Sequence, residues 1–355
     1  MVARRLGAST FLISLLTASQ FAGNISAFLA AHYWQDKPKL PFMVSAWTIS
    51  RALFLFVAFV STPLPFVLLV VAYWIVASLP VPGYAEVMRA IYPDAIRGRA
   101  MAYVRVGMTA CVTVMTPLAG QLLDLVGYQY VFPIAALFGI ASGLAFGRIR
   151  FQEVVTTTRR PMAALWRLLW EDRRYLAFTV AFFVYGFGCL MIVPLLPIFL
   201  VDELHLSYGE VGILGMVNSV CWMLGYVLWG RTVDRRGAFW TLRVNFVLTV
   251  AVPLGFFFAW DVRLVALAYV FNGLTTAGID LGWMTGVIAI ARKDRVGDYT
   301  ALHAFFVGLR GLTAPFLGAT LLLVPGIGLR GALLLSAVLI AAGWALFRRM
   351  PSSDR

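Results

Sequence analysis

Two apolar runs flanking a short basic segment decide the fold. Residues 208–260 read YGEVGILGMVNSVCWMLGYVLWGRTVDRRGAFWTLRVNFVLTVAVPLGFFFAW. Each run is long enough for a helix that crosses a bilayer, which needs about 20 mostly apolar residues whose backbone groups bond within the helix. The segment 231–243 holds four arginines. The stretch therefore predicts two membrane helices whose shared turn faces the cytoplasm.

The same pattern extends along the whole chain of 355 residues. Hydrophobic residues make up 61% of it and charged residues only 13%, whereas a soluble domain carries about 25% charged residues. We expect an all-α polytopic membrane protein rather than a water-soluble fold. Eleven runs predict transmembrane helices: 8–31, 42–60, 64–88, 102–124, 129–147, 175–200, 208–230, 241–260, 264–290, 300–324 and 329–347.

The basic residues predict the orientation of these helices. Of the 29 lysines and arginines, 22 lie in alternate loops and the C-terminal tail, which marks that side as cytoplasmic. We expect a plasma (inner) membrane protein with its C-terminus in the cytoplasm and the N-terminus of this chain outside. The net charge of +13 then reflects membrane topology, and we expect no nucleic-acid partner.

An internal repeat divides the chain. At an offset of 198 residues, Gln20 falls on Asn218, Asp36 on Asp234 and Arg97 on Arg295. Parallel repeats of this kind occur in transporters whose substrate site lies between the halves. We expect an N-terminal bundle at 1–147, a basic cytoplasmic linker with a short amphipathic helix at 148–174, and a C-terminal six-helix bundle at 175–355.

The two halves are unequal. Six runs follow the linker and only five precede it, so the run at 175–200 has no counterpart. We expect that a first transmembrane helix is missing from this chain, through a misassigned start codon or a real loss.

Two short charged motifs stand at the ends of predicted helices: Gly230–Gly237 reads GRTVDRRG and Pro93–Ala100 reads PDAIRGRA. The first resembles the loop signature of the major facilitator superfamily of secondary transporters, and the second resembles the loop before that family's fifth helix. Gly107–Gly120 and Gly127–Phe132 resemble its fifth-helix motif and the entry to its sixth helix. The resemblance implies a two-bundle fold that works by alternating access. The first-half copy of the signature, around Asp36, keeps the acid but lacks both glycines.

The loop signature predicts a gate. Glycine allows a tight turn between helices, and an aspartate there can cap the next helix and pair with arginines of a neighbouring one. Such a pair would form in one conformation and break in the other; the alternative is an ordinary solvated charge cluster. The gating candidates are Gly230, Asp234, Arg235, Arg236, Gly237, Asp36, Arg97 and Arg99.

Polar residues inside the apolar runs are candidates for a substrate or ion pathway, because ionisable groups within a bilayer are costly. Asp280 could bind a cation, carry a proton, or form a static ion pair with Arg310 or Arg105. Arg105 and His303 lie near helix ends, where snorkelling to the interface is the simpler interpretation. The pathway candidates are Asp280, Asn272, Thr276, Arg105, Thr109, Thr113, Arg310, His303, Gln20, Asn24 and Asn218.

The function hypothesis is a secondary active transporter, with no enzymatic activity, cofactor or metal site. We expect a monomer surrounded by membrane lipid, with a small-molecule substrate of unknown identity and a co-transported proton as one option. Two alternatives stay open: a truncated or non-transporting, receptor-like membrane protein, and an integral-membrane enzyme that acts on lipids. The sequence holds no cluster of acids, histidines or nucleophiles of the kind that the lipid enzyme would need.

Overall fold

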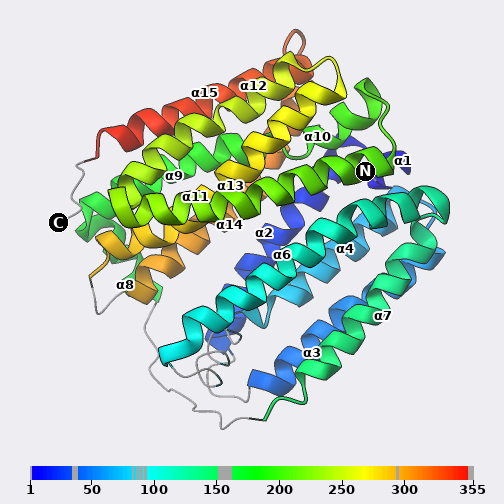
Figure 1. The fold of residues 1–355 in the computed structure, drawn as a ribbon, viewed down its shortest axis with the longest axis horizontal. Coiled ribbons are helices and arrows are strands. Elements are labelled where there is room, and N and C mark those ends of the chain that lie inside the picture. Colours follow the sequence, from blue (N-terminus) through cyan, green and yellow to red (C-terminus); the bar gives the residue numbers. More distant parts are fainter. Residues whose placement is uncertain are drawn as a thin grey trace.

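The fold is helical throughout the part of the chain that the structure describes. A computed structural model describes residues 2–33, 39–81, 84, 87, 91, 94–150, 162–292 and 296–350 (Figure 1). Among these residues, eight helices are long and apolar enough to cross a membrane, and Pro63–Ser78 is a shorter apolar helix. Where the structure describes them, the eleven predicted runs fall mainly on helical residues, so the all-α prediction is confirmed.

The N-terminal helices form two pairs. The helix α2 packs on α4, and α3 with its continuation η1 packs on α7. The long helix α6 packs chiefly on α11 of the C-terminal half instead of on its sequence neighbours. The bounds are α1 Val2–Arg5, α2 Thr10–Tyr33, α3 Lys39–Ala52, the 3₁₀ segment η1 Leu53–Phe59, α4 Pro63–Ser78, α6 Asp94–Leu125 and α7 Tyr128–Phe146.

The C-terminal helices form a larger bundle around an aromatic core. Here α11 packs on α13, and α9 lies against both α14 and α15. The residues Phe178, Phe182, Phe246 and Phe347 are at most 1% exposed and pack in one cluster. The bounds are α8 Met162–Glu171, α9 Arg173–Met191, α10 Leu195–Ile198, the π-helical turn η2 Phe199–Glu203, α11 Tyr208–Thr249, α12 Ala251–Phe258, α13 Val262–Ile290, α14 Val296–Leu321 and α15 Gly328–Arg348.

Acidic and hydroxyl side chains mark where three of these helices begin. Asp172 accepts hydrogen bonds from the amides of Arg174 and Tyr175 at the start of α9, and Asp261 caps α13 in the same way. At the start of α11, Ser207 and Glu210 form a reciprocal capping box. Each cap satisfies amide groups that have no partner within the helix, so these positions fix the helix starts.

The prediction of a loop at 230–237 is wrong except at Gly237. The backbone stays helical through Arg236 and breaks only at Gly237, where φ is +80° and ψ is 166°. Only glycine adopts this conformation without strain, because it has no Cβ. One glycine is therefore enough to separate the two membrane helices that share the label α11.

The loop predicted at 93–100 is also corrected. The helix α6 begins at Asp94, eight residues before the predicted start of that run at 102, so Arg97 and Arg99 lie on a helix. Their side chains are outside the described residues.

The two halves are joined through two helix pairs. The helix α2 packs on α14, and α6 packs on α11. Figure 1 shows α6 and α11 close together near the N-terminus and diverging toward their other ends. The starts of α2 at Thr10 and of α11 at Tyr208 keep the 198-residue offset of the repeat.

Candidate substrate pathway and gate

Two hydrogen bonds connect the predicted polar face of α13 to α11. The Asn272 side-chain amide donates to Oδ1 of Asn218 over 2.9 Å, and the Tyr226 hydroxyl donates to Oδ2 of Asp280 over 2.9 Å. The partners lie eight residues apart on each helix, so both pairs are on the same pair of facing surfaces. The structure thus brings Asn218, Asn272 and Asp280 together as a polar interface between α11 and α13.

Tyr226 is a site residue that the sequence reasoning missed. Aromatic side chains are too common in this chain to stand out, but spacing offers a signal. Tyr226 and Asp280 lie eight residues, or about two helical turns, beyond Asn218 and Asn272, and therefore on the same helix faces. Thr276 lies between the two pairs, where its hydroxyl donates to the carbonyl of Asn272 over 2.7 Å.

The two asparagines line a cavity of about 270 Å³. Its other polar groups are the side chains of Cys189, Thr249 and Tyr269, and aliphatic and aromatic residues complete its wall. Thr249 also bonds the hydroxyl of the buried Tyr185 over 2.9 Å. The described lining contains no charged side chain, so this cavity suits an uncharged polar group in an apolar setting.

Arg310 is held away from Asp280. Its guanidinium donates to the Phe182 carbonyl and fills the space beside Gly186, where a Cβ atom would collide with it. Its Nε atom is buried without a hydrogen-bond partner. Among the described side chains the two ion pairs are Arg4–Asp202 and Arg5–Asp124. The static Asp280–Arg310 pair is therefore absent here, whereas the side chain of Arg105 lies outside the described residues.

His303 does not snorkel, which corrects that interpretation. Its side chain is 5% exposed and stacks on Trp283, with ring centroids 4.9 Å apart and planes 4° apart. The ring also meets Phe182 at 5.4 Å. His303 therefore lies inside the aromatic core of the C-terminal bundle, and Arg310 lies half-buried against α9.

A second cavity, of about 730 Å³, lies between the halves. Gln20 on α2 and Thr116 on α6 supply polar groups, and Tyr208 contributes from α11. Val193 lines this cavity and the smaller one, so the two are adjacent. The other predicted polar residues are scattered: Asn24 is exposed, and the Thr113 hydroxyl bonds the Thr109 carbonyl within α6.

Charged groups join the halves near the N-terminus, a contact that the sequence reasoning missed. Asp124, at the end of α6, accepts hydrogen bonds from the amides of Tyr208 at 3.1 Å and Gly209 at 2.6 Å. Arg5 reaches Asp124 at 3.4 Å and lies 3.6 Å above the Tyr208 ring. Asp124 thus places a negative charge at the positive end of α11 from the opposite half.

A second charged contact lies beside it. Arg4 forms an ion pair with Asp202, which belongs to the turn before α11. We call the contacts of Arg4, Arg5, Asp124 and Asp202 the latch. Close helix packing accompanies it, because Gly120 and Gly212 have no room for a Cβ atom against the backbones of Tyr208 and Pro117.

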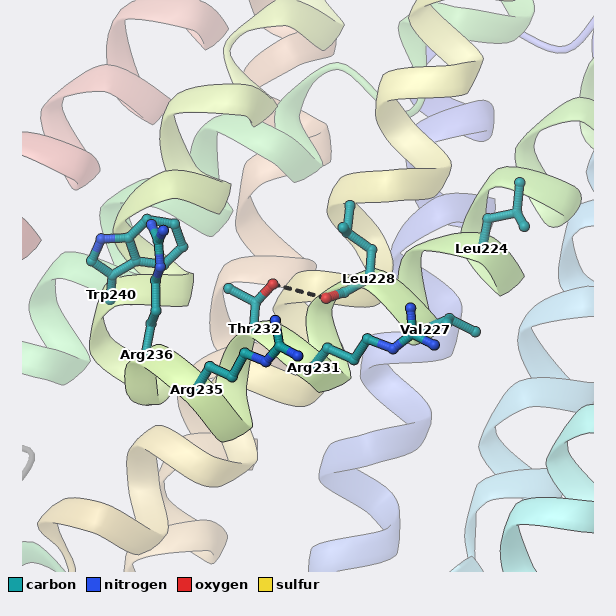
Figure 2. Close-up of a pocket in the computed structure, with 8 residues that line it drawn as sticks. All are labelled: Leu224, Val227, Leu228, Arg231, Thr232, Arg235, Arg236 and Trp240. Carbon is teal, nitrogen blue, oxygen red and sulfur yellow. Dashed lines mark hydrogen bonds between the residues drawn. The ribbon is translucent and has the colours of Figure 1, made fainter.

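The gating candidates of the C-terminal half lie at the far end, seen from the latch, of the first of the two helices that share the label α11, which spans residues 208–236; we call this end the Gly237 end of α11. Asp234, Arg235 and Arg236 are exposed, and no described side chain forms an ion pair with Asp234. Gly230 is helical with open space around it, whereas Gly237 makes the break. Figure 2 shows the arginines along one side of α11. Asp36 lies outside the described residues.

Known proteins resemble this chain in sequence and in fold. A stretch of 136 residues is 24% identical to the chloramphenicol resistance protein CraA of Acinetobacter baumannii, covering 36% of this chain and 33% of that protein. The matched stretch thus spans a third of that relative's length.

Solved structures match over nearly the whole chain. A bacterial homologue of the human lysosomal transporter Spinster, inward-facing and occupied, has a TM-score of 0.75 at 15% identity, over 99% of this chain and 91% of that one. A mutant of the nucleoside transporter NupG has a TM-score of 0.75 at 15% identity, over 97% and 92%. The family model for the Major Facilitator Superfamily matches residues 1–260 and 178–355. This chain is therefore a multi-pass membrane protein that belongs to the Major Facilitator Superfamily.

Proposed function

We propose that this protein is a secondary transporter that moves a small molecule across the membrane by alternating access. One observation carries the proposal: the two helical halves meet at a charged latch, α6 and α11 diverge away from it, and a cavity with a few polar side chains lies between the halves beside a smaller one in the C-terminal half. Exposed ion pairs are weak, typically worth below about 1 kcal/mol each, so such a latch can open and close. Membership in a family of transporters supports the same function.

We further infer that the latch faces the outside and that this conformation opens toward the cytoplasm. The positive-inside rule supports this orientation, because the Gly237 end of α11 carries Arg231, Arg235 and Arg236. The protein would then lie in the plasma membrane with a cytoplasmic C-terminus. The halves would comprise 1–147 and 175–355, joined by the basic linker 148–174.

We propose an uncharged, partly polar substrate. The amides of Asn218 and Asn272 can each donate and accept hydrogen bonds, and the walls around them are apolar. Two of the similar proteins are named for compounds of this class, one as a chloramphenicol resistance protein and one as a nucleoside transporter. Asp280, bonded to Tyr226 beside this cavity face, is our candidate for binding a coupled proton.

The test is flux through the purified protein in liposomes. We expect radiolabelled chloramphenicol or uridine to cross faster than in empty liposomes, and Asn218→Ala with Asn272→Ala to lower the rate. The control is Leu334→Ala, which changes an exposed leucine on α15 outside both cavities. Thermal stabilisation by these compounds without flux would favour the receptor-like alternative. If these compounds neither cross the membrane nor stabilise the protein, the proposed substrate class is contradicted.

A further inference from the structure

The end of α11 that carries the arginines also carries a hollow of about 590 Å³. Figure 2 shows its lining, with Arg231 and Arg235 extended along the helix toward Val227 and Leu228. We call this surface the arginine hollow. It is lined by Leu224, Val227, Leu228, Arg231, Thr232, Arg235, Arg236 and Trp240.

The apolar part of the arginine hollow is exposed and has no partner among the residues that the structure describes. Leu224, Val227 and Leu228 are 58%, 55% and 53% exposed. The packed sides of this helix point elsewhere: the Trp229 indole donates to the Leu274 carbonyl of α13 over 2.8 Å, and Gly212 lies against α6. In a membrane protein, an apolar side that faces away from neighbouring helices lies against acyl chains.

The charged part of the hollow follows within two turns of the apolar part. Arg231, Arg235 and Arg236 are exposed, and Asp234 is the acid among them, which leaves an excess of positive charge. The Arg236 guanidinium lies 4.3 Å above the Trp240 ring, so that arginine is held in place by a cation–π contact. The Thr232 hydroxyl donates to the Leu228 carbonyl over 2.8 Å, which leaves the arginines as the charged donors for a ligand.

We propose that the arginine hollow binds the headgroup of an anionic phospholipid. The planar guanidinium groups of Arg231 and Arg235 match a phosphate with paired hydrogen bonds, and the aliphatic side chains accept the first part of an acyl chain. Tryptophan belongs at the same interfacial level. Apolar side chains, arginines and Trp240 follow one another along this surface, as the acyl chain and headgroup of one amphipathic molecule would require. A soluble phosphate compound would leave the apolar part of the hollow empty.

The test measures lipid retention. The full protein is placed in nanodiscs of phosphatidylcholine with phosphatidylglycerol, extracted in mild detergent, and analysed by native mass spectrometry for bound phosphatidylglycerol. We expect Arg231→Gln with Arg235→Gln to lower the bound fraction about tenfold, because each basic group near an anionic surface contributes to the affinity. The matched control, Arg348→Gln with Arg349→Gln, removes the same charge at the end of α15 and should keep the wild-type fraction.

Other outcomes overturn the proposal. An equal loss in both double variants would mean general attraction to a basic surface, and no loss in either would mean that the hollow holds no lipid. Displacement of phosphatidylglycerol by inorganic phosphate would assign the hollow to a soluble anion.

A further variant, Arg231→Lys with Arg235→Lys, keeps the positive charge but loses the planar guanidinium groups that can form paired hydrogen bonds. We therefore expect this variant to retain a fraction of bound phosphatidylglycerol between those of the wild type and the glutamine variant.

Discussion

Asp280 is the residue of the described pathway whose placement is hardest to explain by packing alone. A carboxyl group within a membrane helix is expensive, and here it faces a tyrosine hydroxyl on the neighbouring helix rather than Arg310. A carboxyl group that accepts a hydrogen bond from a tyrosine hydroxyl at this depth is a candidate for a group that changes its protonation state. The half-buried Arg310 donates a hydrogen bond to the Phe182 carbonyl, which is a structural role.

We predict that Asp280→Asn abolishes proton-coupled transport and leaves the fold intact. Asparagine keeps the shape and can still bond Tyr226, but it cannot release a proton. Substrate-driven proton uptake in liposomes, read with a pH-sensitive dye, measures the effect. The control is Glu203→Gln, an exposed acid at the end of η2, which should transport normally. Wild-type coupling in the Asp280 variant would remove this residue from the mechanism.

Gly237 is the decisive position at the scale of the elements. Its backbone conformation, at φ +80°, is one that residues with a Cβ adopt only with strain. The chain therefore turns there without a loop, and the residues on either side of Gly237 are helical.

We predict that Gly237→Ala lowers the free energy of unfolding by about 1–3 kcal/mol, the usual cost of a residue forced into such a conformation. Gly230→Ala is the matched control, because Gly230 is helical with open space around it, and alanine there should be neutral or slightly stabilising. Thermal unfolding in detergent, followed by fluorescence, compares the two. Equal stability of both variants would contradict the strain argument.

The helices could be predicted from sequence because the bilayer sets their length and hydropathy. The helical course of 230–236 could not, because charged residues beside a membrane span are equally compatible with a loop or an extended helix. The latch was missed for another reason. Arg4, Arg5 and Asp124 read as ordinary residues near helix ends, and Asp124 is 84 residues away from Tyr208, whose amide it binds. Packing between halves, which no local pattern encodes, creates that site.

At the scale of the whole molecule, the latch and the Gly237 end of α11 lie at opposite ends of the helix 208–236. We predict that Asp124→Ala favours opening on the latch side. Losing a helix cap costs roughly 1 kcal/mol, which shifts the conformational equilibrium about five-fold. A cysteine in place of Thr17, in the 730 Å³ cavity, should then react faster with an impermeant thiol reagent added on that side.

The control for this measurement is Arg330→Gln. That exposed arginine bonds the carbonyls of Phe257 and Ala259 within its own half, so its loss should leave the labelling rate unchanged. A rate that does not change in the Asp124 variant would show that the latch does not hold this conformation.

Asp234 should act in the opposite direction. It forms no ion pair with a described side chain in this conformation, so a gating contact would belong to the other one. We predict that Asp234→Asn favours opening toward the cytoplasm, with faster labelling of a cysteine in place of Asn24 in inside-out vesicles. Asp234→Glu, which keeps the charge, should label at the wild-type rate. An unchanged rate in the asparagine variant would leave Asp234 as part of a solvated charge cluster.

The exposed charges of the latch should also make the opening of this protein depend on the salt concentration around it. The side chains of Arg4 and Asp202 are 27% and 37% exposed, and those of Arg5 and Asp124 are 36% and 31% exposed, so dissolved ions reach both pairs. The screening length falls from about 10 Å at 0.1 M salt to about 3 Å at 1 M. Concentrated salt on the latch side should therefore speed labelling of the cysteine at position 17, and Asp124→Ala should blunt that response. A transporter closed in this way would exchange its cargo more readily in brine than in fresh water.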